Sequence, residues 1–211
     1  MPPHAMLNGG RNLYLAGTGS FAREVAEWAE DAGWRVAGLV ELVDEARVGT
    51  AVGGRSVVAA NSLPADSPAV IAAGGDRRAH HASLGGSQWR AATVIHPRAH
   101  ISSSAVIGPG CIVAPGAVIG AEARLGEHTL VSRGALVGHH ARTGRFVSLL
   151  PGANLGGNAS VGDRSVLAMG AVVVNAMTVG ADATVAAGAV VVRDVRDGAR
   201  VQGVPAQEYP S

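Results

Sequence analysis

The chain has 211 residues, of which 47% are apolar, 3% aromatic and 16% charged, and its net charge is +1 with histidine neutral. This composition is too apolar for a disordered chain, and it lacks the basic field and the stacking aromatics that nucleic-acid binding requires. No stretch approaches the ~20 apolar residues of a membrane span, and the single Cys111 rules out an internal disulfide.

The first part of the chain is typical of an α/β domain. Residues 1–10 predict a flexible arm without the basic start and apolar stretch of a secretion signal, so we expect a cytoplasmic protein. Apolar periodicity then predicts a strand at 12–16, a glycine turn at 17–20, a helix at 21–32, strands at 34–40 and 69–73, and a helix at 76–84. Strand, glycine turn, helix and strand in this order are typical of the start of a Rossmann-like domain, and we predict such a domain at 11–92.

A six-residue period governs residues 93–197, and residues 198–211 form a C-terminal tail. Stepping by six from Ile95 to Val191 meets aliphatic residues at every position except Thr143. A small residue usually stands two places earlier, and glycine often follows. An α-helix would scatter these positions around its circumference, because six residues turn it by ~600°. A parallel β-helix explains them: aliphatic residues fill the interior, small ones fit the corners and glycine relieves the turns.

The repeat resembles that of the hexapeptide acyltransferases. The whole chain resembles the family of sialic-acid O-acetyltransferases and bacillosamine N-acetyltransferases, which belong to nucleotide-sugar and surface-glycan pathways. Three segments carry the resemblance: Val-Gly-His-His at 137–140, Pro-Gly-Ala-Asn-Leu-Gly-Gly-Asn at 151–158, and the closing Gly-Val-Pro-Ala at 203–206. It implies a left-handed coil, a homotrimer that binds CoA between neighbouring subunits, and transfer of acetyl from acetyl-CoA to a sugar amine or hydroxyl.

The first two segments contain the expected catalytic residues. His139 falls on the family's catalytic histidine, and imidazole suits a general base because it titrates near working pH. Gly157 matches the glycine whose N–H stabilises the oxyanion. It follows His139 by eighteen residues, so we expect it one coil away on the same edge of the prism. The resemblance also implies that Gly157, Asn158, Ala168 and Gly170 bind the acetyl-CoA cosubstrate.

Two positions near His139 depart from the family pattern. His140 stands where the family has Asp or Glu, so the carboxylate that orients the catalytic histidine is missing from its usual place. Ser148 stands where many members have another histidine. We expect His140 and Ser148 to line the acceptor pocket, and we name Asp163 or Glu127 as a replacement carboxylate.

The expected acceptor-binding residues of the N-terminal domain lie in its turns. The segment Gly-Thr-Gly-Ser-Phe-Ala at 17–22 resembles the family's Gly-x-Gly-Gly-His-Gly/Ala, whose backbone N–H groups suit a pyrophosphate. Glu41 stands near the family's acidic residue that contacts base or ribose, and Gly-Gly-Asp at 74–76 resembles its Gly-Asp/Asn turn. These expected residues are Gly17, Gly19, Ser20, Phe21, Glu41, Gly74 and Gly75.

Together these features predict an acetyl-CoA-dependent acetyltransferase whose acceptor is a nucleotide-linked amino sugar, with a UDP-sugar as the first acceptor to test. Two alternatives stay open: the same chemistry on a non-sugar amine or alcohol, and a catalytically inactive trimeric binding protein. We expect no metal, because His96, His100 and His128 form no ligand-like cluster and are expected at the surface. No nucleic-acid or membrane partner is expected.

Overall fold

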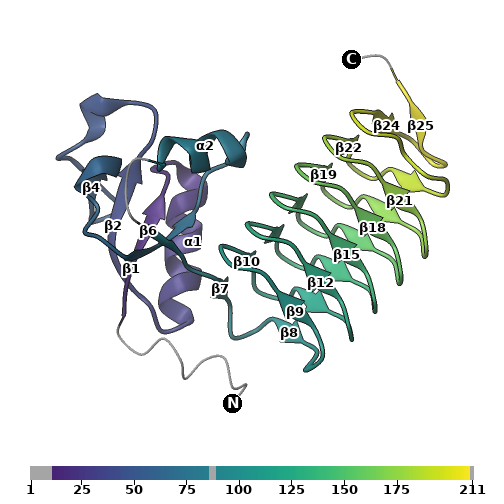
Figure 1. The fold of residues 1–211 in the computed structure, drawn as a ribbon, viewed down its shortest axis with the longest axis horizontal. Helices are drawn as coiled ribbons and strands as arrows, with labels where there is room; N and C mark the ends of the chain where they lie inside the picture. The colour runs from purple at the N-terminus through teal and green to yellow at the C-terminus, as the bar shows by residue number, and fades with distance from the viewer. Residues whose placement is uncertain (1–10, 86–88, 210–211) are drawn as a thin grey trace. The chain divides into compact units, whose positions relative to one another are not determined.

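The computed structural model describes residues 11–85 and 89–209, and the chain divides into two compact units between Pro97 and Arg98 (Figure 1). The arm expected at 1–10 lies outside the described residues, as do the last two residues of the expected tail. The domain limits expected at residues 92 and 197 stay predictions. Within the described ranges, no helix has both the length and the apolarity to cross a membrane.

The N-terminal unit contains a largely parallel sheet in the strand order β3-β4-β2-β1-β5-β6. Only the pairing of β3 with β4 is antiparallel in this sheet, as far as the chain is described. The elements are β1 Asn12–Ala16, α1 Ser20–Asp31, β2 Arg35–Glu41, β3 Ala51–Val52, β4 Arg55–Ala59, β5 Ser67–Ile71, α2 Arg77–Ser83, β6 Trp89–Ala91 and β7 Val94–Ile95. Short 3₁₀ turns occupy Glu45–Arg47 and Ala60–Ser62.

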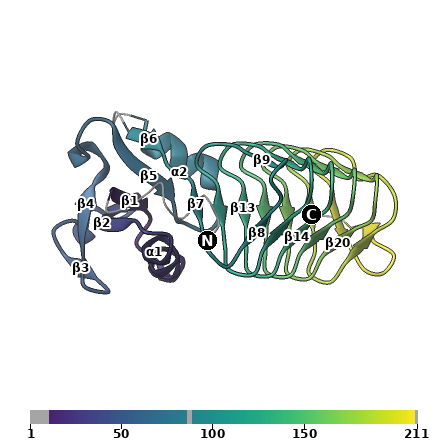
Figure 2. The same cartoon turned by 90° about the horizontal axis from the view of Figure 1, so that it is seen from below.

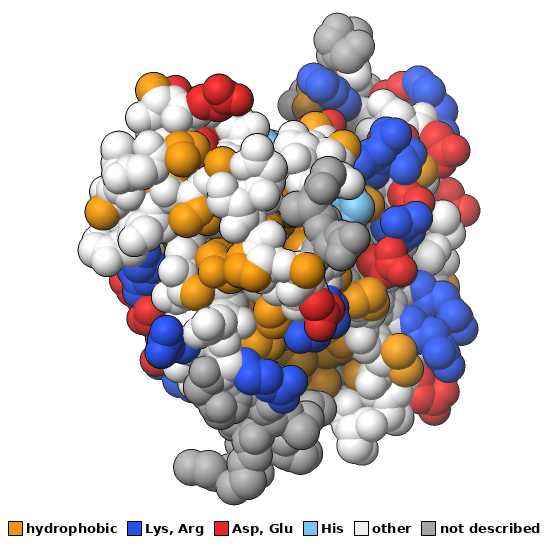
Figure 3. Space-filling model, turned by 60° about the vertical axis from the view of Figure 1, so that its left-hand side comes forward, with side chains coloured by type: hydrophobic (Ala, Val, Ile, Leu, Met, Phe, Trp, Pro, Cys, Tyr) orange, Lys and Arg blue, Asp and Glu red, His pale blue; other side chains and the backbone are white. Residues whose placement is uncertain are grey.

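Most expected elements of this unit are present with small shifts. β1 has the expected bounds, α1 begins one residue early, and β5 begins two residues earlier than its expected range. Helix α1 buries a face formed by Ala22, Val25, Ala26, Trp28 and Ala29. Phe21 is only half-buried; its ring packs edge-on against Trp28, with centroids 6.0 Å apart. Figure 3 shows that acidic and basic side chains are interspersed on one face of the molecule.

The C-terminal unit is a left-handed parallel β-helix built from short strands. Its strands are β8 His100–Ile101, β9 Val106–Ile107, β10 Ile112–Val113, β11 Val118–Ile119, β12 Arg124–Leu125, β13 Leu130–Val131, β14 Leu136–Val137, β15 Arg142–Thr143, β16 Ser148–Leu149, β17 Asn154–Leu155, β18 Ser160–Val161, β19 Val166–Leu167, β20 Val172–Val173, β21 Thr178–Val179, β22 Thr184–Val185, β23 Val190–Val191, β24 Arg200–Gln202 and β25 Gln207–Glu208. Every third strand shares a face, and Figure 2 shows β8, β14 and β20 following one another along the coil.

Pairing between coils has a step of eighteen residues through most of the β-helix, as where Val118 pairs with Leu136 and Leu136 with Asn154. In the last coil the step shortens to sixteen residues, as where Thr184 pairs with Arg200. The second residue of every strand from β10 to β23 is buried, which confirms the six-residue pattern. Thr143, the one polar member, is also buried. Its Oγ1 accepts the N–H of Gly126 at 3.1 Å and lies 3.1 Å from Thr129 Oγ1, so its hydroxyl has hydrogen-bond partners inside the coil.

The glycines that follow the buried residues do not relieve turns, and this part of the expectation is wrong. Gly138 is not among the residues with positive φ, but a Cβ on it would lie 2.5 Å from the backbone N of Gly157 in the next coil. A Cβ at this position would point at the backbone of the next coil, and stacked strands are only ~4.8 Å apart, so no side chain fits there. Left-handed backbone occurs instead at other corner residues, such as His140 and Asn158, both with φ of 58°.

Candidate active site

The two expected catalytic residues lie on one edge of the coil, in consecutive turns. His139 follows β14 and Gly157 follows β17, the next strand on the same face. The N–H of Asn158 donates to the carbonyl of His139 at 2.9 Å, which locks the two turns in register. A Cβ on Gly157 would lie 2.6 Å from His139 Nε2. The imidazole nitrogen therefore faces a position that only glycine can occupy without displacing the ring.

The N–H of Gly157, which we expected to stabilise an oxyanion, has a partner in the structure. It donates to Asn175 Oδ1 at 2.9 Å, one coil further on. The amide oxygen of Asn175 therefore lies where a carbonyl oxygen can accept this N–H. The same position suits the carbonyl oxygen of a thioester, provided that the Asn175 side chain turns away.

His140 links His139 to a carboxylate that the sequence analysis did not name. The Nδ1 atoms of His139 and His140 are 3.2 Å apart, and His140 Nε2 lies 3.3 Å from Glu122 Oε2. Glu122 precedes His140 by eighteen residues, one coil. Stepping back by one coil from His140 would have found it.

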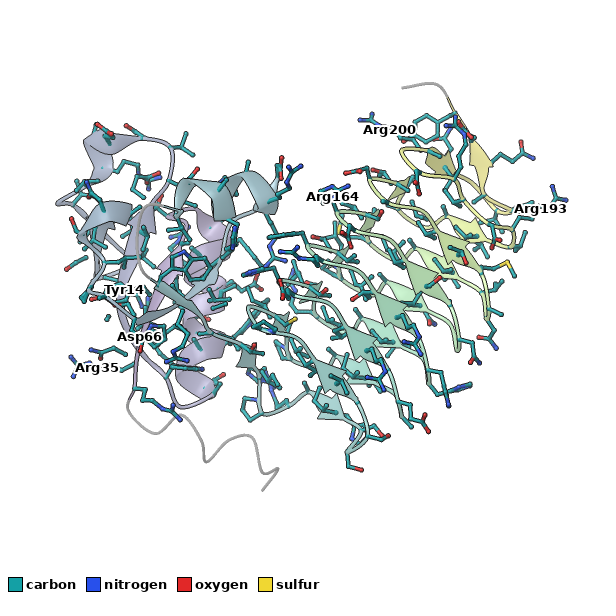
Figure 4. The ribbon with its side chains drawn as sticks, viewed as in Figure 1. Tyr14, Arg35, Asp66, Arg164, Arg193 and Arg200 are labelled. Atoms are coloured by element: carbon teal, nitrogen blue, oxygen red, sulfur yellow. The ribbon has the colours of Figure 1, made fainter. Side chains whose placement is uncertain are left out.

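The two carboxylates that we named instead are engaged elsewhere, so that expectation is wrong. Glu127 Oε2 pairs with Arg145 at 3.1 Å. Asp163 Oδ1 accepts the N–H of Arg145 at 2.8 Å, and its other oxygen lies 3.8 Å from Arg164, which projects from the coil in Figure 4. Both carboxylates follow strands of one other face, β12 and β18, whereas His139 follows β14.

The expected cofactor residues fall on two edges of the coil. Gly157 and Asn158 follow β17, whereas Ala168 and Gly170 follow β19, a strand of a different face. Ser148, expected in the acceptor pocket, belongs to β16 on that second face; it is buried, and its N–H donates to the carbonyl of Ser165. The residues expected to bind CoA thus do not gather at one edge within a single chain.

In the N-terminal unit, a pocket of about 280 Å³ lies at the glycine turn. Its lining includes three of the expected residues, Gly17, Gly19 and Glu41, together with Arg47 and His80. The other expected residues lie outside that lining: Ser20, Phe21, Gly74 and Gly75. A second pocket, of about 340 Å³, shares the segment 41–43 with the first.

The carboxylate of Glu41 accepts hydrogen bonds from two segments that line this pocket. Its Oε1 accepts the N–H groups of residues 42, 43 and 44 at 2.9–3.2 Å, and its Oε2 accepts the Thr18 hydroxyl at 2.5 Å. Burial by itself would raise the pKa of Glu41, but the hydrogen bonds from Thr18 and the backbone outweigh it and lower the pKa below its ordinary value. The carboxylate therefore holds the loop, and its oxygens are already used by protein donors.

Arg47 extends this network to the pocket's surface. Its Nη1 donates to Thr18 Oγ1 at 2.9 Å and its Nη2 to the Thr18 carbonyl at 3.4 Å. The Arg47 side chain is 41% exposed, whereas that of Glu41 is 7% exposed. A guanidinium held beside a glycine turn can bind phosphate oxygens, so Arg47 is a functional candidate that sequence reasoning missed.

Two of the histidines expected at the surface are buried, which corrects that expectation. His96 is 2% exposed, and its Nε2 lies 3.0 Å from Asp31 Oδ2. His128 is 3% exposed and stacks on Phe146 with ring centroids 4.9 Å apart. In the described part of the chain, no group of three or more His, Cys, Asp or Glu side chains is placed to hold a metal ion.

Comparison with known proteins shows to which family the chain is similar. Residues 91–121 match the family described as bacterial transferase hexapeptide (six repeats). Perosamine N-acetyltransferase from Caulobacter crescentus, solved as a variant with CoA and GDP-perosamine, is 32% identical over 96% of this chain and 98% of that chain, with a TM-score of 0.85. The acetyltransferase domain of PglB from Neisseria gonorrhoeae FA1090, in complex with acetyl coenzyme A, is 34% identical over 95% and 100%, with a TM-score of 0.85.

WeeI from Acinetobacter baumannii AYE is 25% identical over 94% of this chain and 100% of that chain, with a TM-score of 0.81. Among curated protein sequences, none matches this chain. Fold and comparisons together define an acetyl-CoA-dependent acetyltransferase of the hexapeptide-repeat class. Within that class, the chain belongs to the family of nucleotide-sugar N-acetyltransferases that includes the perosamine enzyme.

Proposed function

We propose that this protein acetylates the amine of a sugar carried on a nucleoside diphosphate, with His139 as the general base. The observation that carries the proposal is the approach of His139 Nε2 to Gly157 on the edge of the coil. Relatives over 30% identical across nearly the whole chain are acetyltransferases solved with CoA or acetyl-CoA. The cytoplasmic location expected from the sequence is part of this proposal.

The proposed chemistry needs few groups. The acceptor amine attacks the thioester carbonyl carbon, a C–N bond forms, and the carbonyl oxygen becomes an oxyanion that the Gly157 N–H stabilises. His139 Nε2 takes a proton from the attacking nitrogen. The C–S bond then breaks, and the CoA thiolate leaves and receives that proton from the imidazolium. The acetyl carbonyl oxygen replaces Asn175 Oδ1 as the partner of Gly157.

The N-terminal unit is proposed to hold the nucleotide. Its parallel strands in the order β4-β2-β1-β5-β6 have the 3-2-1-4-5 arrangement of a Rossmann-like sheet, in which ligands bind beyond the carboxyl ends of the strands. The glycine turn and Arg47 line a pocket at that end, after β1. The diphosphate would lie against the N-terminus of α1, and the neighbouring 340 Å³ pocket has room for part of the nucleoside.

A homotrimer completes the proposal. Val118 and Leu136 are 37% and 40% exposed on neighbouring strands of one face, which supports packing of that face against another copy. The expected CoA residues lie on two edges of the coil. A site between subunits would combine Gly157 and Asn158 of one chain with Ala168 and Gly170 of the next.

Two measurements test the proposal. Calorimetry with GDP and with UDP identifies the nucleotide; GDP comes first because the perosamine relative was solved with GDP-perosamine. Release of CoA thiol from acetyl-CoA, in the presence of the matching nucleotide amino sugar, measures turnover. The only cysteine, Cys111, is fully buried and adds little to a thiol assay. Binding of acetyl-CoA without turnover on any amine or alcohol tried would favour the inactive binding protein instead.

A further inference from the structure

We infer that Glu122 and His140 form a relay that replaces, from a neighbouring coil, the carboxylate missing beside His139. This inference rests on the proposed role of His139 as general base. His140 bridges the gap, with 3.2 Å between the two Nδ1 atoms on one side and 3.3 Å from Nε2 to Glu122 Oε2 on the other. Glu122 and His140 are both positioning residues that act through His139, and for His140 this role takes the place of the acceptor-pocket role expected from the sequence.

The relay has one arrangement of protons that leaves His139 able to act. A general base needs an unprotonated Nε2, so the neutral His139 ring must carry its proton on Nδ1. That N–H can donate only to an unprotonated Nδ1 of His140, which places the proton of His140 on its Nε2. Glu122 Oε2 lies opposite that N–H. The carboxylate thus selects the tautomer of His140, and His140 selects the tautomer of His139.

The relay also affects the charge that develops during the reaction. When His139 takes a proton at Nε2, the two rings together carry one positive charge. A carboxylate 3.3 Å from the second ring stabilises that charge, whereas a second imidazole by itself cannot. The side chains of His140 and Glu122 are 49% and 62% exposed in the single chain, so solvent moderates the effect.

The coil holds the relay in place through its backbone. Glu122 and His140 occupy equivalent corners in consecutive turns, both with φ of 58°. The N–H of Glu122 donates to Ser104 Oγ at 3.0 Å, and the N–H of His140 donates to the Ala121 carbonyl at 2.8 Å. Asp is one of the residues that tolerate left-handed backbone, so His140→Asp can place the family's carboxylate beside His139 without new strain.

A double-mutant cycle tests the relay. We expect Glu122→Gln to lower kcat about three- to fivefold, the upper part of the range for one exposed charge pair, and to leave the KM for acetyl-CoA within about twofold. In a His140→Asp background, the same Glu122→Gln change should alter kcat less than about twofold, because the carboxylate is then adjacent to His139. Glu127→Gln is the matched control: Glu127 is also exposed and paired, but with Arg145, and its loss should leave kcat unchanged.

Nitrogen NMR of labelled histidine gives a second readout that does not depend on turnover. Wild-type His139 should carry its proton on Nδ1, and Glu122→Gln should shift the ring toward a mixture of tautomers. Unchanged kcat in Glu122→Gln, equal losses in both backgrounds, or tautomers that do not respond to Glu122 would overturn the relay. Full activity in His139→Ala would overturn the proposed function instead, so the two failures are distinguishable.

Discussion

In the coil, residues eighteen apart in the sequence stack in successive turns, so His139 meets Gly157 and His140 meets Glu122 by translation along one axis. In the N-terminal unit, the pocket gathers Gly17 from the turn after β1, Glu41 from the end of β2 and Arg47 from the segment that follows β2. Because the coil repeats every eighteen residues, the sequence spacing predicts which residues of this site lie next to each other. The loop-built pocket depends on how the segments between strands fold back, and spacing does not specify that.

The largest expected effect tests the coil. Replacing His139 with Ala should lower kcat by about 10²- to 10⁴-fold, because it removes the group proposed to take the proton of the acceptor amine. Affinity for GDP or UDP should not change, since the nucleotide is assigned to the N-terminal unit. Turnover assays together with nucleotide calorimetry check both statements. Comparable losses of turnover and nucleotide affinity would contradict this division of roles.

A second prediction distinguishes a glycine needed for catalysis, Gly157, from a glycine needed for packing between coils, Gly138. Gly157→Ala places a Cβ 2.6 Å from His139 Nε2, so we expect kcat to fall by about 10²-fold while the melting temperature changes little, because an exposed imidazole can rotate away. Gly138→Ala instead places a Cβ 2.5 Å from the backbone N of Gly157. That variant should lose about 1–3 kcal/mol of stability, which thermal and denaturant unfolding measure.

The third prediction tests the loop-built pocket. Arg47→Ala should weaken nucleotide binding about tenfold, the worth of one charge-assisted hydrogen bond to a phosphate. Affinity for acetyl-CoA should stay within twofold of the wild type. Arg145→Ala, which removes a paired arginine from the coil, is the matched control and should leave nucleotide affinity unchanged. Equal nucleotide affinity in wild type and Arg47→Ala would show that this arginine is structural.

The smallest effect concerns pH. The hydrogen bonds of Glu41 lower its pKa in the folded protein, so its contribution to stability is present above the ordinary value near 4.5 and is lost as pH falls through the lowered pKa. Glu41→Gln should therefore destabilise the N-terminal unit at pH 7, and its difference from wild type should shrink in acid. Trp28, Trp34 and Trp89 all lie in this unit, so tryptophan fluorescence during urea unfolding reports on it alone. A difference that grows in acid would contradict the assignment.

Much of the coil could be predicted because its physical constraints repeat. An aliphatic residue every sixth position fills the same interior in each turn, and this predicted the buried positions, including the phase of His139 and Gly157. The role of the following glycines was misjudged, because a glycine required by the close approach of the next coil looks the same in sequence as one required by a turn. In the N-terminal unit, β3, β4 and β6 were not predicted, since strands of two to five residues are too short to show a clear apolar period.

The six-residue period alone predicted the class of fold, and the resemblance of three segments to a known family indicated the acetyltransferase activity and the roles of His139 and Gly157. Their spacing of eighteen residues places the two residues in consecutive turns on one edge of the coil. The groups that surround these two residues could be identified only in the folded protein. It placed Glu122 behind His140, Asn175 on the Gly157 N–H, and Arg47 beside the glycine turn. These contacts depend on side-chain directions and loop paths, which are set when segments distant in the sequence pack together.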